Sequence, residues 1–289
     1  MHGFLLIDKP AGMTSHDVVD RVRRLTGERT VGHAGTLDPF ATGLLIVGIG
    51  RTATKEFQKL VGLDKEYEAT FAFGAESDTD DRTGKITARG NHPITPPWEG
   101  GDEKKRVLPF PRGGSLLAAS RQAEGLPTVG QIKDILPTFL GHIKQVPPAY
   151  AAIKVGGKKM YEAARAGTPI KAEPRDVRVD AFVMLNEAKH LSTGPSAAPQ
   201  DDNAVSRFAF RIACSSGTYI RALARDLGYA VGSSAYVEEL RRTAVGPFSA
   251  SRAVPLGALT PATTGASIIP VPALLAALPK RDGSATLPA

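Results

Sequence analysis

Residues 32–43, GHAGTLDPFATG, place a single carboxylate, Asp38, in a segment built largely from glycine and proline. Glycine permits a positive φ or the close approach of another group, while Pro39 fixes its own φ and keeps Asp38 out of the helical region. The apolar run 44–49 follows at once and predicts a buried strand that anchors the segment. We therefore expect a rigid loop that holds an acid toward a ligand, although a plain turn with a solvated Asp has the same pattern.

Three further motifs occur in order around this segment: LIDKPAG at 6–12, KEY at 65–67 and SGTYIR at 216–221. Together with 32–43 they resemble the tRNA pseudouridine synthase B family. The resemblance runs from about residue 3 to 73 and from 126 to 248. It implies isomerisation of one uridine to pseudouridine at position 55, in the T-loop of tRNA, by base flipping and attack of an aspartate.

Hydrophobic periodicity and capping residues predict how strands and helices alternate along the chain. Thr14 with Asp17, and Thr128 with Gln131, have the spacing of helix-capping boxes. Interleaved elements with several hairpin-like turns predict an α+β protein with a mixed, largely antiparallel central sheet flanked by helices, which is also the fold that the resemblance implies. Strands are expected near 4–7, 44–49, 67–73, 175–185 and 205–214, and helices near 15–27, 52–60, 128–140 (with Pro137 as a kink or early end), 158–166, 218–227 and 271–278.

The domain organisation expected from the resemblance is a catalytic domain over residues 1–250 followed by a short tail. Within that domain, residues 128–170 would form an inserted thumb that grips RNA. Residues 90–125 and 188–204 match no motif of the family, and 90–125 is expected to be a surface loop because it is rich in proline and glycine. Residues 251–289 are too few for the C-terminal RNA-binding domain that many members carry.

The reaction itself constrains the catalytic residues. It breaks the bond from ribose C1′ to N1 of uracil and rejoins C1′ to C5, so it needs a group that forms and releases an adduct, and an ionised carboxylate suits this. By resemblance Asp38 is that group, Arg221 is the cation that stabilises its anion, and Tyr67 faces the flipped base. Attack at C1′, attack at C6 and removal of the C2′ proton stay open, as do stacking and proton transfer for Tyr67. On residue type alone, Arg221 fits a helix surface and Tyr67 fits a core.

Further residues are assigned to substrate binding by the same resemblance. His33 corresponds to the position that stacks in the disrupted T-loop, and Tyr219 and Leu240 correspond to positions that line the uracil pocket. Basic side chains are candidates for phosphate contacts, although most surface lysines are simply solvated. These candidates are Lys9, Arg51, Lys154, Lys158 and Lys159.

Composition narrows the remaining possibilities. The chain has 36 Lys and Arg against 29 Asp and Glu, a net charge of +7, which favours a polyanionic partner but also fits a slightly basic enzyme. The lone cysteine, Cys214, cannot form an internal disulfide, and the six histidines lack metal-ligand spacing. No apolar run approaches the roughly 18 residues of a membrane span. These features favour a cytoplasmic protein without a metal site or a membrane span, and the resemblance implies a monomer that binds the tRNA T-arm with no cofactor and no obligatory protein partner.

Two other functions fit parts of the sequence. One is an RNA-binding or RNA-folding protein in which catalysis is incidental, and the other is an aspartate-dependent hydrolase of small molecules. The segment from Asp78 to Thr83 resembles a phosphatase loop at Asp78 and Asp80, but Arg82 stands where that motif needs Thr or Val. The expected structure for this segment is a solvated acidic hairpin.

Overall fold

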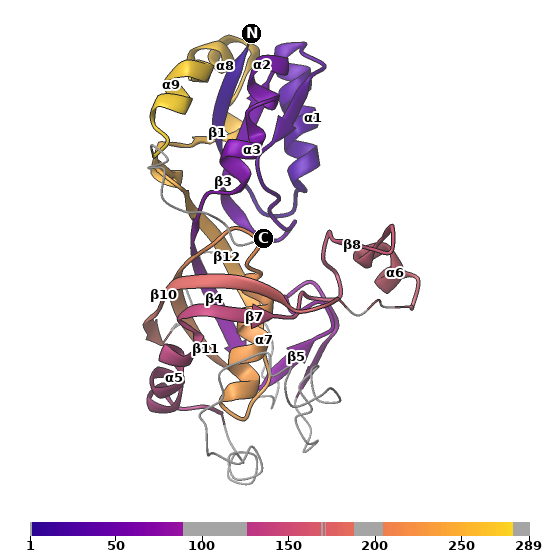
Figure 1. Cartoon of the computed structure of the whole chain (residues 1–289), viewed down its shortest axis with the longest axis vertical. Helices are drawn as coiled ribbons and strands as arrows, with labels where there is room; N and C mark the ends of the chain where they lie inside the picture. Colours follow the sequence, from indigo (N-terminus) through magenta and orange to yellow (C-terminus); the bar gives the residue numbers. More distant parts are fainter. Residues whose placement is uncertain (1, 89–125, 169, 171, 188–204, 280–289) are drawn as a thin grey trace, which may run out of the picture. The chain divides into compact units, whose positions relative to one another are not determined.

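The computed structural model describes residues 2–88, 126–168, 170, 172–187 and 205–279, and these divide into two compact units (Figure 1). Unit 1 combines the two ends of the chain, residues 1–65 and 241–289, and unit 2 contains residues 66–240. The chain therefore passes between the units twice, once within strand β4 (Lys65–Phe73) and once within strand β12 (Ala235–Val245).

Helix α1 (Ser15–Thr26) of unit 1 begins and ends where the sequence predicts. The Thr14 side chain accepts a hydrogen bond from the Asp17 backbone N–H, and the Asp17 carboxylate accepts one from the Thr14 N–H, so both capping-box bonds are present. Gly27 ends the helix at φ 70°, a left-handed angle that glycine adopts without strain. Val18, Val19 and Val22 lie on the buried face, as the periodicity indicates.

The sheet of unit 1 mixes parallel and antiparallel pairs. β1 (Gly3–Lys9) and β3 (Thr42–Ile49) are antiparallel over their whole length, and β3 then pairs in parallel with β12 at Arg241 and Arg242. Short strands complete the sheet: β2 (Val31–His33) on β3, β13 (Phe248–Ser249) on β12, and β14 (Val254–Pro255) parallel to β1.

The helix expected at 52–60 is instead two short helices, α2 (Arg51–Thr54) and α3 (Phe57–Val61). The backbone N–H of Glu56 bonds to Ala53, and that of Lys59 bonds to Glu56, so the α-helical ladder tightens to i→i+3 bonds at the break. The break places the Phe57 ring over two glycines, Gly32 and Gly48, where a Cβ would come within 2.8 and 2.7 Å of the ring. Packing on glycine therefore decides this local structure.

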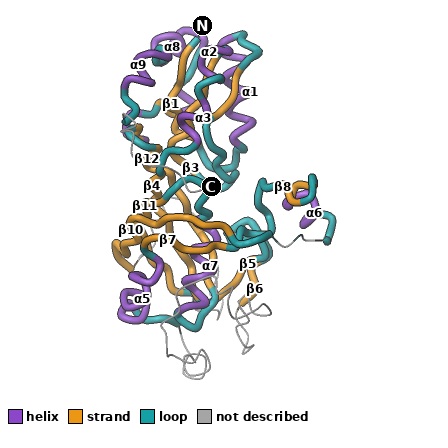
Figure 2. The backbone as a smooth tube through the Cα atoms, in the orientation of Figure 1, coloured by secondary structure: helices purple, strands orange, loops and turns teal. Residues whose placement is uncertain are grey.

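The residues expected to form a C-terminal tail pack into unit 1. Phe4 and Ile269 exchange two backbone hydrogen bonds of 2.8 Å, and Leu274 joins the buried cluster that contains Phe4, Leu6 and Leu44. Helix α8 (Pro261–Ser267) has its own capping box, and α9 (Val271–Ala276) lies beside β1 (Figure 2). The domain boundary expected at residue 250 stays a prediction, but the chain beyond it contributes to the same core.

The sheet of unit 2 has the order β12-β4-β11-β10-β7. Aromatic rings fill one side of β4, where Phe71 lies 4.7 Å from Phe210 and 6.1 Å from Phe182 between ring centroids. Ala72 on the opposite side packs with Tyr236, so both faces are buried from Ala69 onward, while the start of β4 keeps the predicted alternation, with Glu66 and Glu68 exposed. The other strands are β7 (Gly141–Gln145), β10 (Arg175–Glu187) and β11 (Ser206–Cys214), with β7/β10 and β10/β11 antiparallel.

The remaining elements of unit 2 confirm several predictions from the sequence. Helix α5 (Val129–Ile135) has both bonds of the Thr128 capping box and gives way to a 3₁₀ turn over Leu136–Phe139, where Pro137 stands. The acidic segment joins β5 (Ala75–Ser77) to β6 (Ile86–Ala88), and α7 (Ile220–Ala230) follows β11. The range 128–170 expected for the thumb contains α5 and β7 as well as β8 (Lys154–Val155), β9 (Lys158–Lys159) and α6 (Met160–Arg165), and the thumb itself stays a prediction.

These elements confirm the α+β fold with a mixed, mostly antiparallel sheet. The stretches 90–125 and 188–204, for which the sequence analysis expects no family match, lie outside the described residues apart from their flanks. Within the described chain, every helix is too short or too polar to cross a lipid bilayer.

We expect Leu274→Ala to destabilise the protein by about 2–4 kcal/mol, because it leaves a cavity in the core of unit 1. Chemical denaturation monitored by circular dichroism measures the change. Leu185→Ala is the matched control, since this leucine is 48 % exposed and its truncation should cost under about 1 kcal/mol. Equal losses in the two variants would contradict a structural role for the C-terminal residues.

Candidate active site

The Asp38 loop, defined here as residues 34–41, connects β2 to β3 and holds Asp38 half-buried. Gly35 and Gly43 flank it at φ 103° and 98°, angles that side chains rarely adopt. A Cβ at Gly43 would also collide with the backbone oxygen of Arg242 on the paired strand. The glycines therefore serve both purposes that the sequence analysis expects, an unusual backbone angle and a close approach.

Arg242 holds the part of the loop that precedes Asp38. Its side chain is 1 % exposed and donates to three backbone oxygens, at 2.8 Å to Leu44 and at 3.2 Å to both Gly35 and Thr36. Loop carbonyls have no partners in a ladder, so a buried guanidinium with several donors can bind them together. Arg242 thereby sets the path of the chain two residues before Asp38.

Ser15 fixes the residue next to Asp38. Its hydroxyl accepts a hydrogen bond of 2.9 Å from the Leu37 N–H and donates one of 3.1 Å to the Leu37 carbonyl, and the residue is 2 % exposed. On the other side of the carboxylate, the Gly12 N–H donates to the Pro39 carbonyl at 2.8 Å. Both peptide neighbours of Asp38 are thus bound to the start of the chain.

Lys9 lies buried beneath the same loop. Its ammonium donates to the carbonyls of Pro10 at 2.9 Å, Met13 at 2.7 Å and Pro39 at 3.3 Å. Three donors thus meet three acceptors in the interior, so the prediction that Lys9 contacts phosphate is wrong. The side chain supports the Asp38 loop instead.

Electrostatics tie Lys9 to Asp38. Burial lowers the pKa of Lys9 to about 8, the Asp38 carboxylate opposes this shift, and the nearby Arg242 guanidinium adds to it. A cation beside Asp38 is expected from the sequence, but the cation that unit 1 itself supplies is Lys9. Sequence analysis missed this because an exposed and a buried lysine have the same pattern.

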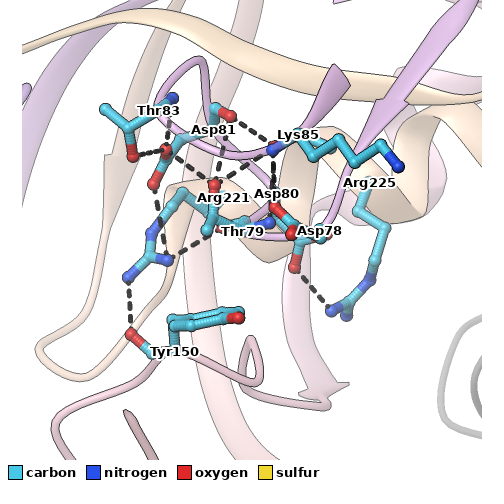
Figure 3. Close-up of polar contacts among 10 residues, drawn as sticks. Asp78, Thr79, Asp80, Asp81, Thr83, Lys85, Tyr150, Arg221 and Arg225 are labelled. Carbon is cyan, nitrogen blue, oxygen red and sulfur yellow. Dashed lines mark hydrogen bonds and ion pairs between the residues drawn. The ribbon is translucent and has the colours of Figure 1, made fainter. Parts of the chain in front are cut away.

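Arg221 occupies the first turn of α7 and is 4 % exposed, so a surface role is excluded. It donates to the Thr79 carbonyl at 2.9 Å and to the Tyr150 carbonyl at 3.3 Å, and lies 3.5 Å from the Asp81 carboxylate (Figure 3). These contacts all lie in unit 2. The pairing of Arg221 with Asp38 stays a prediction.

The acidic segment forms the predicted hairpin, but two of its carboxylates, Asp80 and Asp81, are not solvated as expected. Asp81 is 4 % exposed, and its Oδ1 accepts bonds of 2.9 Å from both the Thr83 N–H and the Thr79 hydroxyl (Figure 3). The Asp80 side chain is 15 % exposed and pairs with Arg225 at 3.1 Å. The sequence does not show this pairing because the cationic partners of the acidic segment come from α7, more than 140 residues further along the chain.

The other predicted pocket residues differ in burial. Tyr67 on β4 and Leu240 on β12 are 8 % and 7 % exposed, which suits a pocket wall and a core equally. Tyr219 is half-buried and packs against Ala151, Ile153 and Met160 in the thumb. The buried Gln145 amide, which sequence reasoning did not single out, accepts from the Tyr219 N–H at 2.8 Å and donates to its carbonyl at 3.0 Å.

The predicted residues that could contact a nucleic acid lie on both units. His33 ends β2, half-buried, and its pKa is lowered by burial and then by the Arg242 charge, so the ring is neutral near pH 7. Lys158 is exposed in the thumb turn, while Lys159 pairs with Glu162 at 3.0 Å. Lys154 is paired in register with Lys159 across the hairpin. No three His, Cys, Asp or Glu side chains gather as metal ligands in the described part of the chain.

Unit 1 therefore brings Lys9 and Asp38 close enough to interact, with His33 at the end of β2 just before the same loop, and unit 2 brings together Arg221 and the acidic segment. The sequence analysis missed the supporting residues, above all Ser15 and Arg242. The sequence marks these two residues only by their positions. Arg242 is a charged residue inside the segment that forms strand β12, and Ser15 directly follows the helix cap Thr14.

Comparison with known proteins gives consistent matches over most of the chain. Residues 23–97 and 115–220 match a family model described as TruB family pseudouridylate synthase (N terminal domain), and residues 221–267 match one described as tRNA pseudouridylate synthase B C-terminal domain. The chain is 41 % identical over 268 residues to tRNA pseudouridine synthase B of Leifsonia xyli subsp. xyli, covering 93 % of this chain and 74 % of the relative. It is 40 % identical over 259 residues to the protein of the same name from Bordetella pertussis, covering 90 % and 87 %.

A solved structure shares the fold. The chain aligns with a chain in the crystal structure of a Cbf5-Nop10-Gar1 complex with a TM-score of 0.55 and 25 % identity. The alignment covers 88 % of this chain and 52 % of that chain, so this chain spans about half the length of the structural relative.

We expect Lys9→Met to change the pH dependence of stability. The pKa of Lys9 is about 8 in the folded state and near its usual 10.5 when unfolded, so the unfolded state binds more protons between these values. This lysine therefore makes the free energy of unfolding rise between pH 8 and pH 10, and Lys9→Met removes that rise. Urea titrations of wild type, Lys9→Met and the exposed control Lys55→Met measure it, and parallel curves for all three would contradict the assignment.

Proposed function

The chain belongs to the TruB family of pseudouridylate synthases, and we propose that Asp38 is the nucleophile with which it converts uridine to pseudouridine in tRNA. The observation that carries this assignment is the Asp38 loop. Asp38 is half-buried, while the peptides on either side are bound by Ser15 and Gly12 and the path before them is fixed by Arg242. Little free energy is needed to orient a reactive group that is already held in this way.

An ionised carboxylate is common to every route that the chemistry allows. Attack at C1′, attack at C6 and removal of the C2′ proton each need Asp38 in its charged form. The buried Lys9 ammonium beneath the loop supplies a positive charge that interacts with the Asp38 carboxylate. The products contain the same atoms as the substrate, so these residues need no external reagent to complete the isomerisation.

We assign Arg221 and Tyr67 to the same reaction. The target base must leave its stack before Asp38 can reach it, at a cost of a few kcal/mol, and an aromatic ring can recover roughly 1–3 kcal/mol of this by stacking. Tyr67 supplies such a ring, and Arg221 supplies a positive charge fixed by two carbonyls. The role of Arg221 as the cation that stabilises the Asp38 anion rests on the family resemblance.

Recognition of the T-loop at position 55 is proposed to rest on shape and phosphate contacts. A neutral His33 can stack in the space that the flipped base leaves, and burial keeps it neutral. Tyr219 and Leu240 would line the uracil pocket, and Lys154 and Lys158 would contact phosphates from the thumb. We further propose a cytoplasmic location and a monomer active on its own, which fractionation and light scattering would test.

We expect Asp38→Asn to lower pseudouridine formation by on the order of a thousandfold or more, with tRNA binding retained, because the amide keeps the shape but loses the nucleophile. Position-resolved pseudouridine mapping on an unmodified tRNA transcript, with no cofactor added, measures activity. Filter binding measures affinity.

Asp20→Asn serves as the matched control, since this aspartate lies on α1 with a 41 % exposed side chain and should leave the rate unchanged. Full activity of Asp38→Asn would refute the proposed function. Release of free uracil from a nucleoside would favour a hydrolase. If Asp38→Asn still refolds tRNA as well as the wild type does, refolding does not need catalysis, and this result would favour an RNA-folding protein.

We expect the double variant Lys154→Gln/Lys158→Gln to weaken tRNA binding about tenfold and to reduce the slope of log K against log salt by about 1.5–2, as two lost phosphate contacts require. The control is Lys55→Gln/Lys59→Gln, which removes the same charge from exposed positions at the end of α2 and on α3, outside the expected thumb. The same loss of affinity in both double variants would show that only net charge matters.

A further inference from the structure

Helix α7 carries two arginines one turn apart, Arg221 and Arg225, and both reach the same two segments of unit 2 (Figure 3). Residues four apart lie on one face of a helix, so the two guanidinium groups act side by side. Arg221 binds the carbonyls of Thr79 and Tyr150. The proposed function uses Arg221 and leaves Arg225 without a role.

Arg225 holds the same segments from the next turn of the helix. Its Nη1 lies 3.1 Å from the Asp80 carboxylate, its Nη2 donates to the Val146 carbonyl at 2.9 Å, and its Nε donates to the Asp226 carboxylate at 2.9 Å. The side chain is 10 % exposed, so little water competes for these bonds. Asp80 and Val146 are close neighbours in sequence of Thr79 and Tyr150, the contacts of Arg221.

The backbone at Asp80 sends two consecutive carboxylates to two different arginines. Asp80 has φ 59°, the one left-handed angle at a non-glycine residue in the described chain. The Val237 N–H donates to the Asp80 carbonyl at 3.1 Å and the Arg82 N–H donates to the Val237 carbonyl at 2.9 Å, which holds the turn. Asp81 then faces Arg221 at 3.5 Å while Asp80 faces Arg225 at 3.1 Å.

The charges of this cluster depend on Arg225. Burial raises the pKa of Asp80, and it raises that of Asp226 to about 6, while the Arg225 charge opposes both shifts. Without Arg225, Asp80 would lose the larger of its two counter-charges, Asp226 would lose its ion-pair partner, and the segment at Val146 would lose its bond to α7. Arg221 would then keep its own contacts on segments that are less firmly held.

We propose that Arg225 is a positioning residue for pseudouridine formation, which holds Asp80 and Val146 so that the guanidinium of Arg221 keeps its working orientation. The inference rests on the proposed function, because it assumes that Arg221 acts in the reaction. Arg225 acts through Arg221, and its loss should slow the chemical step more than it weakens tRNA binding.

The test compares Arg225→Gln and Asp80→Asn with the wild type. Asn tolerates the left-handed backbone at position 80, so Asp80→Asn removes the charge and keeps the turn. We expect both variants to lower the single-turnover rate at saturating tRNA about tenfold or more, with the Kd for tRNA changed less than about threefold. Arg207→Gln is the matched control, because it breaks the partly exposed 2.7 Å pair with Glu238 elsewhere in unit 2 and should keep the wild-type rate.

A double-mutant cycle separates positioning from general stability. If Arg225 acts through Arg221, then Arg225→Gln should cost less than about threefold in an Arg221→Lys background, whereas independent effects would multiply. Multiplying effects, or wild-type rates in both Arg225→Gln and Asp80→Asn, would overturn the inference. If Arg225→Gln does not fold, the same cycle with Asp80→Asn decides. The proposed function is tested separately by Asp38→Asn. If Asp38→Asn is inactive while Arg225→Gln and Asp80→Asn keep the wild-type rate, the inference on Arg225 fails and the proposed function stands. If Asp38→Asn is active, the proposed function itself fails.

Discussion

Buried cations that bind backbone carbonyls are the constraint on which the site of unit 1 depends. The Asp38 loop has no ladder partners for its carbonyls, and in the interior such groups need donors. Arg242 supplies donors to Gly35, Thr36 and Leu44, and Lys9 supplies one to Pro39. Each cation binds several carbonyl dipoles at once, so the backbone on both sides of Asp38 is held in place.

In unit 2, buried cations again bind backbone carbonyls, and they also pair with carboxylates. Arg221 and Arg225 bind the carbonyls of Tyr150 and Val146 and at the same time meet Asp81 and Asp80. Removing one partner from such a network leaves a buried charge with fewer partners, so changing one of these residues alone is costly. This explains why a segment that looks like a polar surface turn is among the more constrained parts of the chain.

The relation between local signals and the fold is clear for particular elements. Helices α1 and α5 begin where Thr14 and Thr128 predict, because a capping box needs only residues three apart. The helix expected at 52–60 divides in two because Phe57 packs on Gly32 and Gly48, which are distant in sequence. In the same way, the C-terminal residues looked like a tail because their apolar side chains find their partners only on β1.

The sequence by itself determined the family, the fold class and the identity of Asp38 as a carboxylate in a glycine-rich loop, since these depend on motifs and spacings that are local. Only the tertiary structure decided which charges are buried. Lys9 changed from a phosphate contact to a support of the loop, and Asp80 and Asp81 changed from solvated to paired. The physical reason is that the burial of a charge depends on partners brought from far along the chain, which no local pattern records.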